Sequence, residues 1–82
     1  GDMLLGEHSD FRCTLHSRVE GSLQLLAEKG KPLGVLVLNG EMSLELSREE
    51  KVVSAYESFV LHAGESVNID PRSQEVSFVT VH

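Results

Sequence analysis

The sequence has one cysteine, Cys13, no tryptophan, and only 5% aromatic residues. A single cysteine cannot form an internal disulfide, so we expect a reducing compartment, the cytoplasm. Because aromatic side chains are few, a core must be built mainly from Leu and Val. Basic residues are also scarce: 7 Lys and Arg stand against 13 Asp and Glu, a formal charge of −6. This balance argues against nucleic acid as a partner, since its phosphates need a basic surface.

Long apolar runs are missing as well. No run approaches the roughly 20 residues of a membrane span, and residues 3–5 are too few for a signal-peptide core, so we expect no membrane partner. A chain of 82 residues predicts one domain, residues 1–82. We interpret Gly1 and Asp2, which precede Met3, as a cloning remnant and leave them out of the fold argument. So short a chain buries only about 60–65% of its unfolded surface, and a second copy would add to its core.

The clearest pattern lies in residues 33–46. Residues 34–38 form a continuous apolar run, which is typical of a strand covered on both faces. The residues after Gly40 alternate between apolar and polar side chains, so they form two faces of a strand. The expected inward face carries Met42, Leu44 and Leu46, and the outward face carries Glu41, Ser43, Glu45 and Ser47. Asn39 and Gly40 tolerate positive φ angles, so they predict a two-residue hairpin between these strands.

Further short strands are predicted on both sides of this segment, at residues 11–16, 23–27, 52–55, 59–61, 67–69 and 76–81. In the first of them, Phe11, Cys13 and Leu15 share an apolar face, so we expect Cys13 to be a buried, inert thiol. Residues 47–51 have a capping pattern that begins at Ser47, but the valines that follow favour a strand, and we predict a solvated turn. About eight strands without a helical period indicate an all-β barrel or sandwich.

Two segments resemble a known signature. Residues 35–44 and 59–69 are similar to the paired motifs of the cupin superfamily, a Val-Leu-x-Gly-Glu hairpin followed by Leu-x-x-Gly-Asp/Glu. The Gly-Glu-Ser-Val run that begins at Gly64 also resembles the C-terminal β-domain of the type I mannose-6-phosphate isomerases. The likeness covers residues 21–81. It implies a small cupin-like (RmlC-like) double-stranded β-helix, the jelly-roll barrel or sandwich.

The resemblance also implies a metal centre, but this sequence departs from its ligand pattern. Gly21 and Gly40 match the two ends of the first cupin motif. The His-x-His and Glu positions between them fall on Ala27, Lys29 and Leu33. The His position of the second motif falls on Glu75, with Pro71 displaced by one residue. One carboxylate cannot hold a divalent ion, so we expect no metal and no other cofactor.

Two kinds of functional site remain possible, an anion-binding site and a metal site. Lys29, Lys31 and Arg72, with Glu75, are expected at the mouth of such a barrel, where a cationic surface would bind a carboxylate or a sugar phosphate. An ion pair between Lys29 and Glu75 that only fills the former ligand space is the simpler interpretation. An unorthodox metal site is the other alternative, and its ligands would be His16, His62 and Glu75.

Three functions therefore stay open. The first is a non-catalytic module that binds a small polar ligand or a protein partner. The second is a homodimerisation domain, with residues 3–5 and 76–81 as contact strands because a terminal strand lacks a partner. The third is a metal-dependent enzyme built on the His and Glu residues named above. We favour the first and lean against an enzyme, because no Gly-x-Ser-x-Gly elbow supports a Ser-His-acid arrangement.

Overall fold

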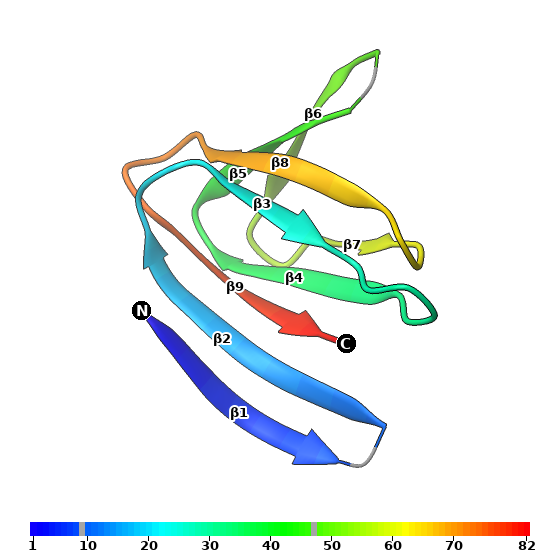
Figure 1. Cartoon of the computed structure of the whole chain (residues 1–82). Helices are drawn as coiled ribbons and strands as arrows, with labels where there is room; N and C mark the ends of the chain where they lie inside the picture. Colours follow the sequence, from blue (N-terminus) through cyan, green and yellow to red (C-terminus); the bar gives the residue numbers. More distant parts are fainter. Residues whose placement is uncertain (9, 47) are drawn as a thin grey trace.

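The computed structural model describes residues 1–8, 10–46 and 48–82, and within them the chain forms nine strands and no helix (Figure 1). The five-stranded sheet has the order β1 (Asp2–His8), β2 (Phe11–Val19), β9 (Val76–Val81), β4 (Leu33–Asn39) and β7 (Ser58–Leu61). The four-stranded sheet has the order β3 (Leu23–Leu26), β8 (Ser66–Pro71), β5 (Glu41–Glu45) and β6 (Glu50–Ser54). Every neighbouring pair is antiparallel. The predicted all-β jelly-roll class is confirmed.

The chain changes sheet at almost every step. From β2 to β9 only the step from β5 to β6 stays within one sheet. Strands that pair are therefore mostly distant in sequence, as β2 with β9 and β3 with β8. This winding of one chain between two layers is the jelly-roll arrangement.

The hairpin predicted at Asn39 and Gly40 is wrong. The chain does turn there, and Gly40 has a φ of 84°. However, β4 pairs with β9 and β7, whereas β5 pairs with β6 and β8. Turn residues permit a change of direction but do not select the strand partner. Gly40 is instead the corner at which the chain passes from one sheet to the other.

The core lies between the two sheets and is aliphatic except for Phe78. Its largest fully buried side chains come from both sheets and are Phe78, Met42, Ile69, Val37 and Val76. Leu44 is also buried, as its alternation predicted, but Leu46 lies beyond the end of β5 and is 37% exposed. Ser43 belongs to the opposite face of β5, yet neighbouring side chains cover it, so it is buried. Ser47 lies outside the described residues.

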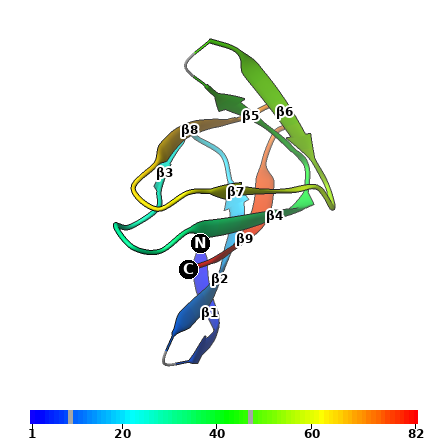
Figure 2. The same cartoon turned by 90° about the vertical axis from the view of Figure 1, so that its right-hand side faces the viewer.

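The sequence analysis did not predict β1, and it assigned the apolar face of β2 to the core, whereas that face points outward. Asp2, which had been left out of the fold argument, belongs to β1 and pairs with His16 of β2. Phe11 is exposed and the free thiol of Cys13 is half-buried, so their face of β2 is an outer surface. The reason is that the β1–β2 hairpin extends beyond the four-stranded sheet, as Figure 2 shows, and has no second layer to pack against.

Two smaller differences concern the strand ends. Residues 50 and 51, predicted to lie in a turn, already belong to β6, and the amide of Leu46 donates to the carbonyl of Glu49 (2.9 Å) in the connection before it. Residues 76–81 form β9, which pairs on both sides with β2 and β4 and is not an unpaired end strand. The described residues contain no helix long and apolar enough to cross a membrane.

Candidate functional site

A polar cleft lies against the inner side of the β1–β2 hairpin, and we call it the mouth cleft. It consists of two adjoining hollows of about 490 and 170 Å³, which share Glu28 and His82. The larger hollow is lined by Glu7, His8, Phe11, Arg12, Glu28, Lys31 and His82. The smaller hollow adds His16 and Thr80, with part of β3 and Leu33.

The cleft owes its polar wall to alternation along β2. His16 lies opposite Phe78 on β9, and Thr14 lies opposite Thr80. Because paired residues share a face of a sheet, and Phe78 and Thr80 are buried, this face of β2 points inward. Arg12 continues the same row and exchanges two backbone hydrogen bonds with His82, of 2.6 and 3.0 Å. The sequence thus places basic and hydroxyl side chains on the inner face of the hairpin.

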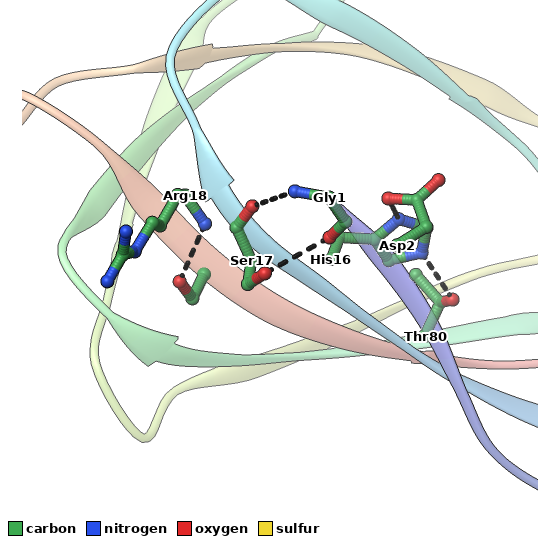
Figure 3. Close-up of polar contacts among 7 residues, drawn as sticks. Gly1, Asp2, His16, Ser17, Arg18 and Thr80 are labelled. Atoms are coloured by element: carbon green, nitrogen blue, oxygen red, sulfur yellow. Dashed lines mark hydrogen bonds and ion pairs between the residues drawn. The ribbon is translucent and has the colours of Figure 1, made fainter.

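His16 is held in place by hydrogen bonds on both ring nitrogens (Figure 3) and by stacking on one ring face. Its Nδ1 lies 2.9 Å from a carboxylate oxygen of Asp2, and its Nε2 lies 2.9 Å from the hydroxyl of Thr80. The ring also stacks on Phe78, with centroids 4.8 Å apart. Since a carboxylate only accepts, Nδ1 donates to Asp2, and Nε2 shares a hydrogen bond with the hydroxyl of Thr80, which can both donate and accept. Neither nitrogen is therefore free to bind a metal ion.

The charges in the larger hollow are mixed. The guanidinium of Arg12 forms an ion pair with Glu7 at 2.7 Å, and both side chains are about half exposed. Lys31 lines the same hollow, and its ammonium donates a long hydrogen bond of 3.4 Å to the carbonyl of Asp10. An exposed pair of this kind contributes only about 0–1 kcal/mol, so an incoming anion can compete with Glu7 for Arg12.

Of the four residues proposed for an anion site, the structure brings only Lys31 into the cleft. Lys29 belongs to the same loop but does not line the hollow. Arg72 and Glu75 lie at the far end of β4 and β9, about 20 Å away by the length of a seven-residue strand. There Arg72 pairs with Glu50 at 2.8 Å and lines a separate groove of about 600 Å³. The four residues do not form one site.

The structure also separates Lys29 from Glu75, so the ion pair proposed between them does not form. Nor do the cupin ligand positions suit a metal, because Ala27 and Leu33 are buried in the apolar core. Within residues 1–8, 10–46 and 48–82, no three His, Cys, Asp or Glu side chains lie close enough to share a metal ion. The proposed set of His16, His62 and Glu75 is therefore not assembled.

Sequence reasoning missed Arg12, Glu7 and His82 as lining residues. The signal was present, because Arg12, Thr14 and His16 alternate with the apolar residues of the same strand. That polar face was taken for the solvent side, since the apolar face was assigned to the core. Because the hairpin extends past the four-stranded sheet, the polar face of β2 points inward and its apolar face points outward, opposite to the prediction.

With this geometry established, comparison with known proteins shows the fold. No protein-family model and no curated protein matches the sequence. Several solved structures do match its shape. A cupin-2 domain containing protein from Shewanella frigidimarina has a TM-score of 0.83 at 16% identity, over 100% of this chain and 78% of that chain. The Cupin_2 domain of an XRE family transcriptional regulator from Enterobacter cloacae has a TM-score of 0.81 at 15% identity, over 99% of this chain and 92% of that chain.

A third match is the Cnp3 cupin domain from Schizosaccharomyces pombe, with a TM-score of 0.81 at 13% identity, over 98% of this chain and 61% of that chain. Identities this low establish architecture alone, because a fold hosts many unrelated activities. The chain therefore has the cupin fold, and the resemblance to cupins noted in the sequence is confirmed at the level of the fold.

Proposed function

We propose that this chain is a non-catalytic cupin-like module that binds a small anionic ligand, a carboxylate or a phosphate ester, in the mouth cleft. The observation that carries the proposal is the pair of cations, Arg12 and Lys31, that line one hollow of about 490 Å³. A guanidinium offers two parallel N–H donors to a carboxylate or phosphate, and an ammonium adds a point charge. A concave site with a few converging polar groups is the usual form of a small-molecule site.

Two further points support the proposal. The Gly-Glu-Ser-Val run that begins at Gly64 resembles a segment of the mannose-6-phosphate isomerases, so a hexose phosphate is a reasonable ligand to test. One neighbour of the same fold is a domain of a transcriptional regulator, so a cupin domain serves there as part of a larger regulator. Among the residues that the structure describes, no metal ligand set lines the mouth cleft, which favours binding over metal-dependent catalysis.

The test is thermal unfolding with inorganic phosphate, citrate and a hexose 6-phosphate, with the uncharged hexose as the reference. A ligand at ten times its Kd should stabilise the protein by about 1.4 kcal/mol, a rise in Tm of roughly 5–10 °C. Arg12→Gln and Lys31→Gln should each abolish most of the rise. Arg72→Gln, which removes a cation at the other end of the molecule, should leave it unchanged.

A variant that is expected to strengthen anion binding makes the test more specific. Glu7 occupies Arg12 at 2.7 Å, so Glu7→Gln frees the guanidinium and should tighten binding of the same anion. A nonspecific effect of removing surface charge would not weaken binding in Arg12→Gln and strengthen it in Glu7→Gln. If none of the three anions raises Tm, or if Arg72→Gln removes the rise while Arg12→Gln keeps it, the mouth cleft is not the binding site.

A further inference from the structure

A hollow of about 360 Å³ lies on the outer side of the five-stranded sheet, at Gly34. The register places this glycine of β4 between Val81 of β9 and Val60 of β7, on the same face of the sheet. Because Gly34 has no side chain, the two valines form walls and the backbone of β4 forms the floor. Apart from its chain neighbours, a Cβ built at Gly34 would meet only the carbonyl oxygen of Val81, at 3.9 Å. The missing side chain therefore leaves room on the sheet.

This hollow, which we call the side hollow, has an apolar body and a polar end. Its apolar lining consists of Phe11, Pro32, Gly34, Val60 and Val81. The exposed fractions of Phe11, Val60 and Val81 range from 42% to 61%. The polar lining residues lie within two residues of a strand end: Asp10 before β2, Lys31 before β4 and His82 after β9. An occupant with one polar end and one apolar end would match this division.

The polar end of the side hollow is also part of the mouth cleft. Phe11, Lys31 and His82 line both. The ammonium of Lys31 therefore lies at the boundary between them, where its contact with the carbonyl of Asp10 is a long hydrogen bond of 3.4 Å. An anionic group bound by Lys31 can thus continue into the side hollow as an apolar chain.

We propose that the ligand of the mouth cleft is an aliphatic carboxylate whose chain lies in the side hollow. This inference rests on the proposed function, because it needs an anionic head group bound by Lys31 and Arg12. Asp10, Glu7 and Glu28 also line the two hollows. Their carboxylates repel a head group with two charges more than a head group with one, so a carboxylate suits the site better than a phosphate.

The length of the chain follows from the backbone between Lys31 and Gly34. Three residues advance by about 10 Å in an extended conformation, which is the reach of roughly seven or eight carbons joined by bonds of about 1.5 Å. A fully buried methylene tightens binding about fourfold, and a methylene half-buried in an open hollow about twofold. Octanoate, with four methylenes more than butyrate, should therefore bind about 15-fold more tightly.

Isothermal titration calorimetry with butyrate, hexanoate and octanoate tests the proposal. In the unaltered protein Kd should fall about 15-fold along the series, and uncharged hexanol should bind at least about 10-fold more weakly than hexanoate. Gly34→Val fills the side hollow, because the position has room for a Cβ and valine favours a strand. Octanoate should bind this variant no more tightly than butyrate does.

Gly6→Val is the matched control. Gly6 of β1 pairs with Cys13, which pairs with Val81, so it lies in the same row as Gly34 and three strands away. A Cβ at Gly6 meets no described atom within 4 Å, and Gly6 does not line the side hollow. This variant gains the same side chain on the same face and should keep the dependence on chain length. Circular dichroism checks that both variants fold.

Val60→Ser provides a second variant if Gly34→Val does not fold. Val60 is a 61% exposed wall of the side hollow, and its loss should weaken binding of octanoate but not of butyrate. If short anions bind through Arg12 and Lys31 but longer chains bind no more tightly, the proposed function stands and this inference fails. If neither carboxylates nor phosphates bind, both fail.

Two further results would overturn the inference. A dependence on chain length that persists in Gly34→Val would place the chain outside the side hollow. The other possible occupant is a second copy of this chain. A dimer that is seen by light scattering and that Gly34→Val dissociates, together with no effect of chain length, would show that a second copy fills the hollow.

Discussion

Replacement of Gly40 by alanine should be among the most damaging single-methyl changes in this protein. Gly40 has a φ of 84°, and a Cβ built there would lie 2.6 Å from the carbonyl oxygen of Glu75 and 3.3 Å from the Cα of Val76. Those atoms belong to the end of the turn between β8 and β9 and to the first residue of β9, so they cannot yield without moving backbone. Ser73 holds the two corners together, because its hydroxyl donates to the carbonyl of Glu75 (2.8 Å) and accepts from the amide of Glu41 (3.1 Å).

The magnitude follows from comparison with Gly30 and Gly64. These residues have φ angles of 86° and 85°, but a Cβ at either position meets nothing within 4 Å. Alanine at a left-handed φ costs about 1–2 kcal/mol, partly offset by about 0.4–1 kcal/mol from the stiffer unfolded chain. Gly30→Ala and Gly64→Ala should therefore cost about 1 kcal/mol or less. Gly40→Ala adds a steric term of about 1–3 kcal/mol, for a total of roughly 2–4 kcal/mol.

Urea unfolding followed by far-ultraviolet circular dichroism is the assay, since the chain has no tryptophan. All variants should be compared at one protein concentration, because association shifts apparent stability. At about 1 kcal/mol per molar urea, Gly40→Ala should lower the midpoint by roughly 2 M or more. Equal midpoints for Gly40→Ala and Gly30→Ala would refute the close packing of the two corners.

Two further predictions concern the core and the metal. Leu44→Ala should lower the free energy of unfolding by roughly 2–4 kcal/mol, whereas Leu46→Ala, at a partly exposed position, should cost under about 1 kcal/mol; similar urea midpoints would contradict the burial of Leu44. Elemental analysis after purification without a chelator should find no stoichiometric transition metal. About one Zn, Fe, Ni or Mn per chain, lost in His16→Ala or His62→Ala, would show that a metal site exists.

Sequence patterns predicted the elements of this fold better than their partners. The turn at Asn39 and Gly40 was correct because it depends on the backbone freedom of two residues. The strand pairing was wrong because β4 finds its partners in β7 and β9, which come 19 or more residues after the end of β4. No local feature of the sequence indicates those partners. The first strand was missed because residues 3–8 combine apolar and polar residues without alternation.

The candidate site was also predicted only in part from the sequence. Lys31 was identified from its place in a loop near the expected mouth, and it does line the cleft. Glu75 was grouped with it by alignment to a motif and Arg72 by its place in a loop expected nearby, but the short connection between β8 and β9 leaves both at the opposite end of the sheet. Arg12 was overlooked because alternation gives two faces to a strand and does not say which face is inward.

The sequence by itself determined the all-β class, the aliphatic core and several of the turns, such as the one at Asn39 and Gly40, because these depend on composition, alternation and the φ preferences of single residues. Only the tertiary structure decided which strands pair and which face of the β1–β2 hairpin points inward. Those properties arise from contacts between segments distant along the chain. A strand that extends past its opposing sheet can turn its polar side inward and its apolar side outward. In this protein that reversal places His16 and Arg12 on the side of the mouth cleft and leaves Phe11 exposed on the outer side.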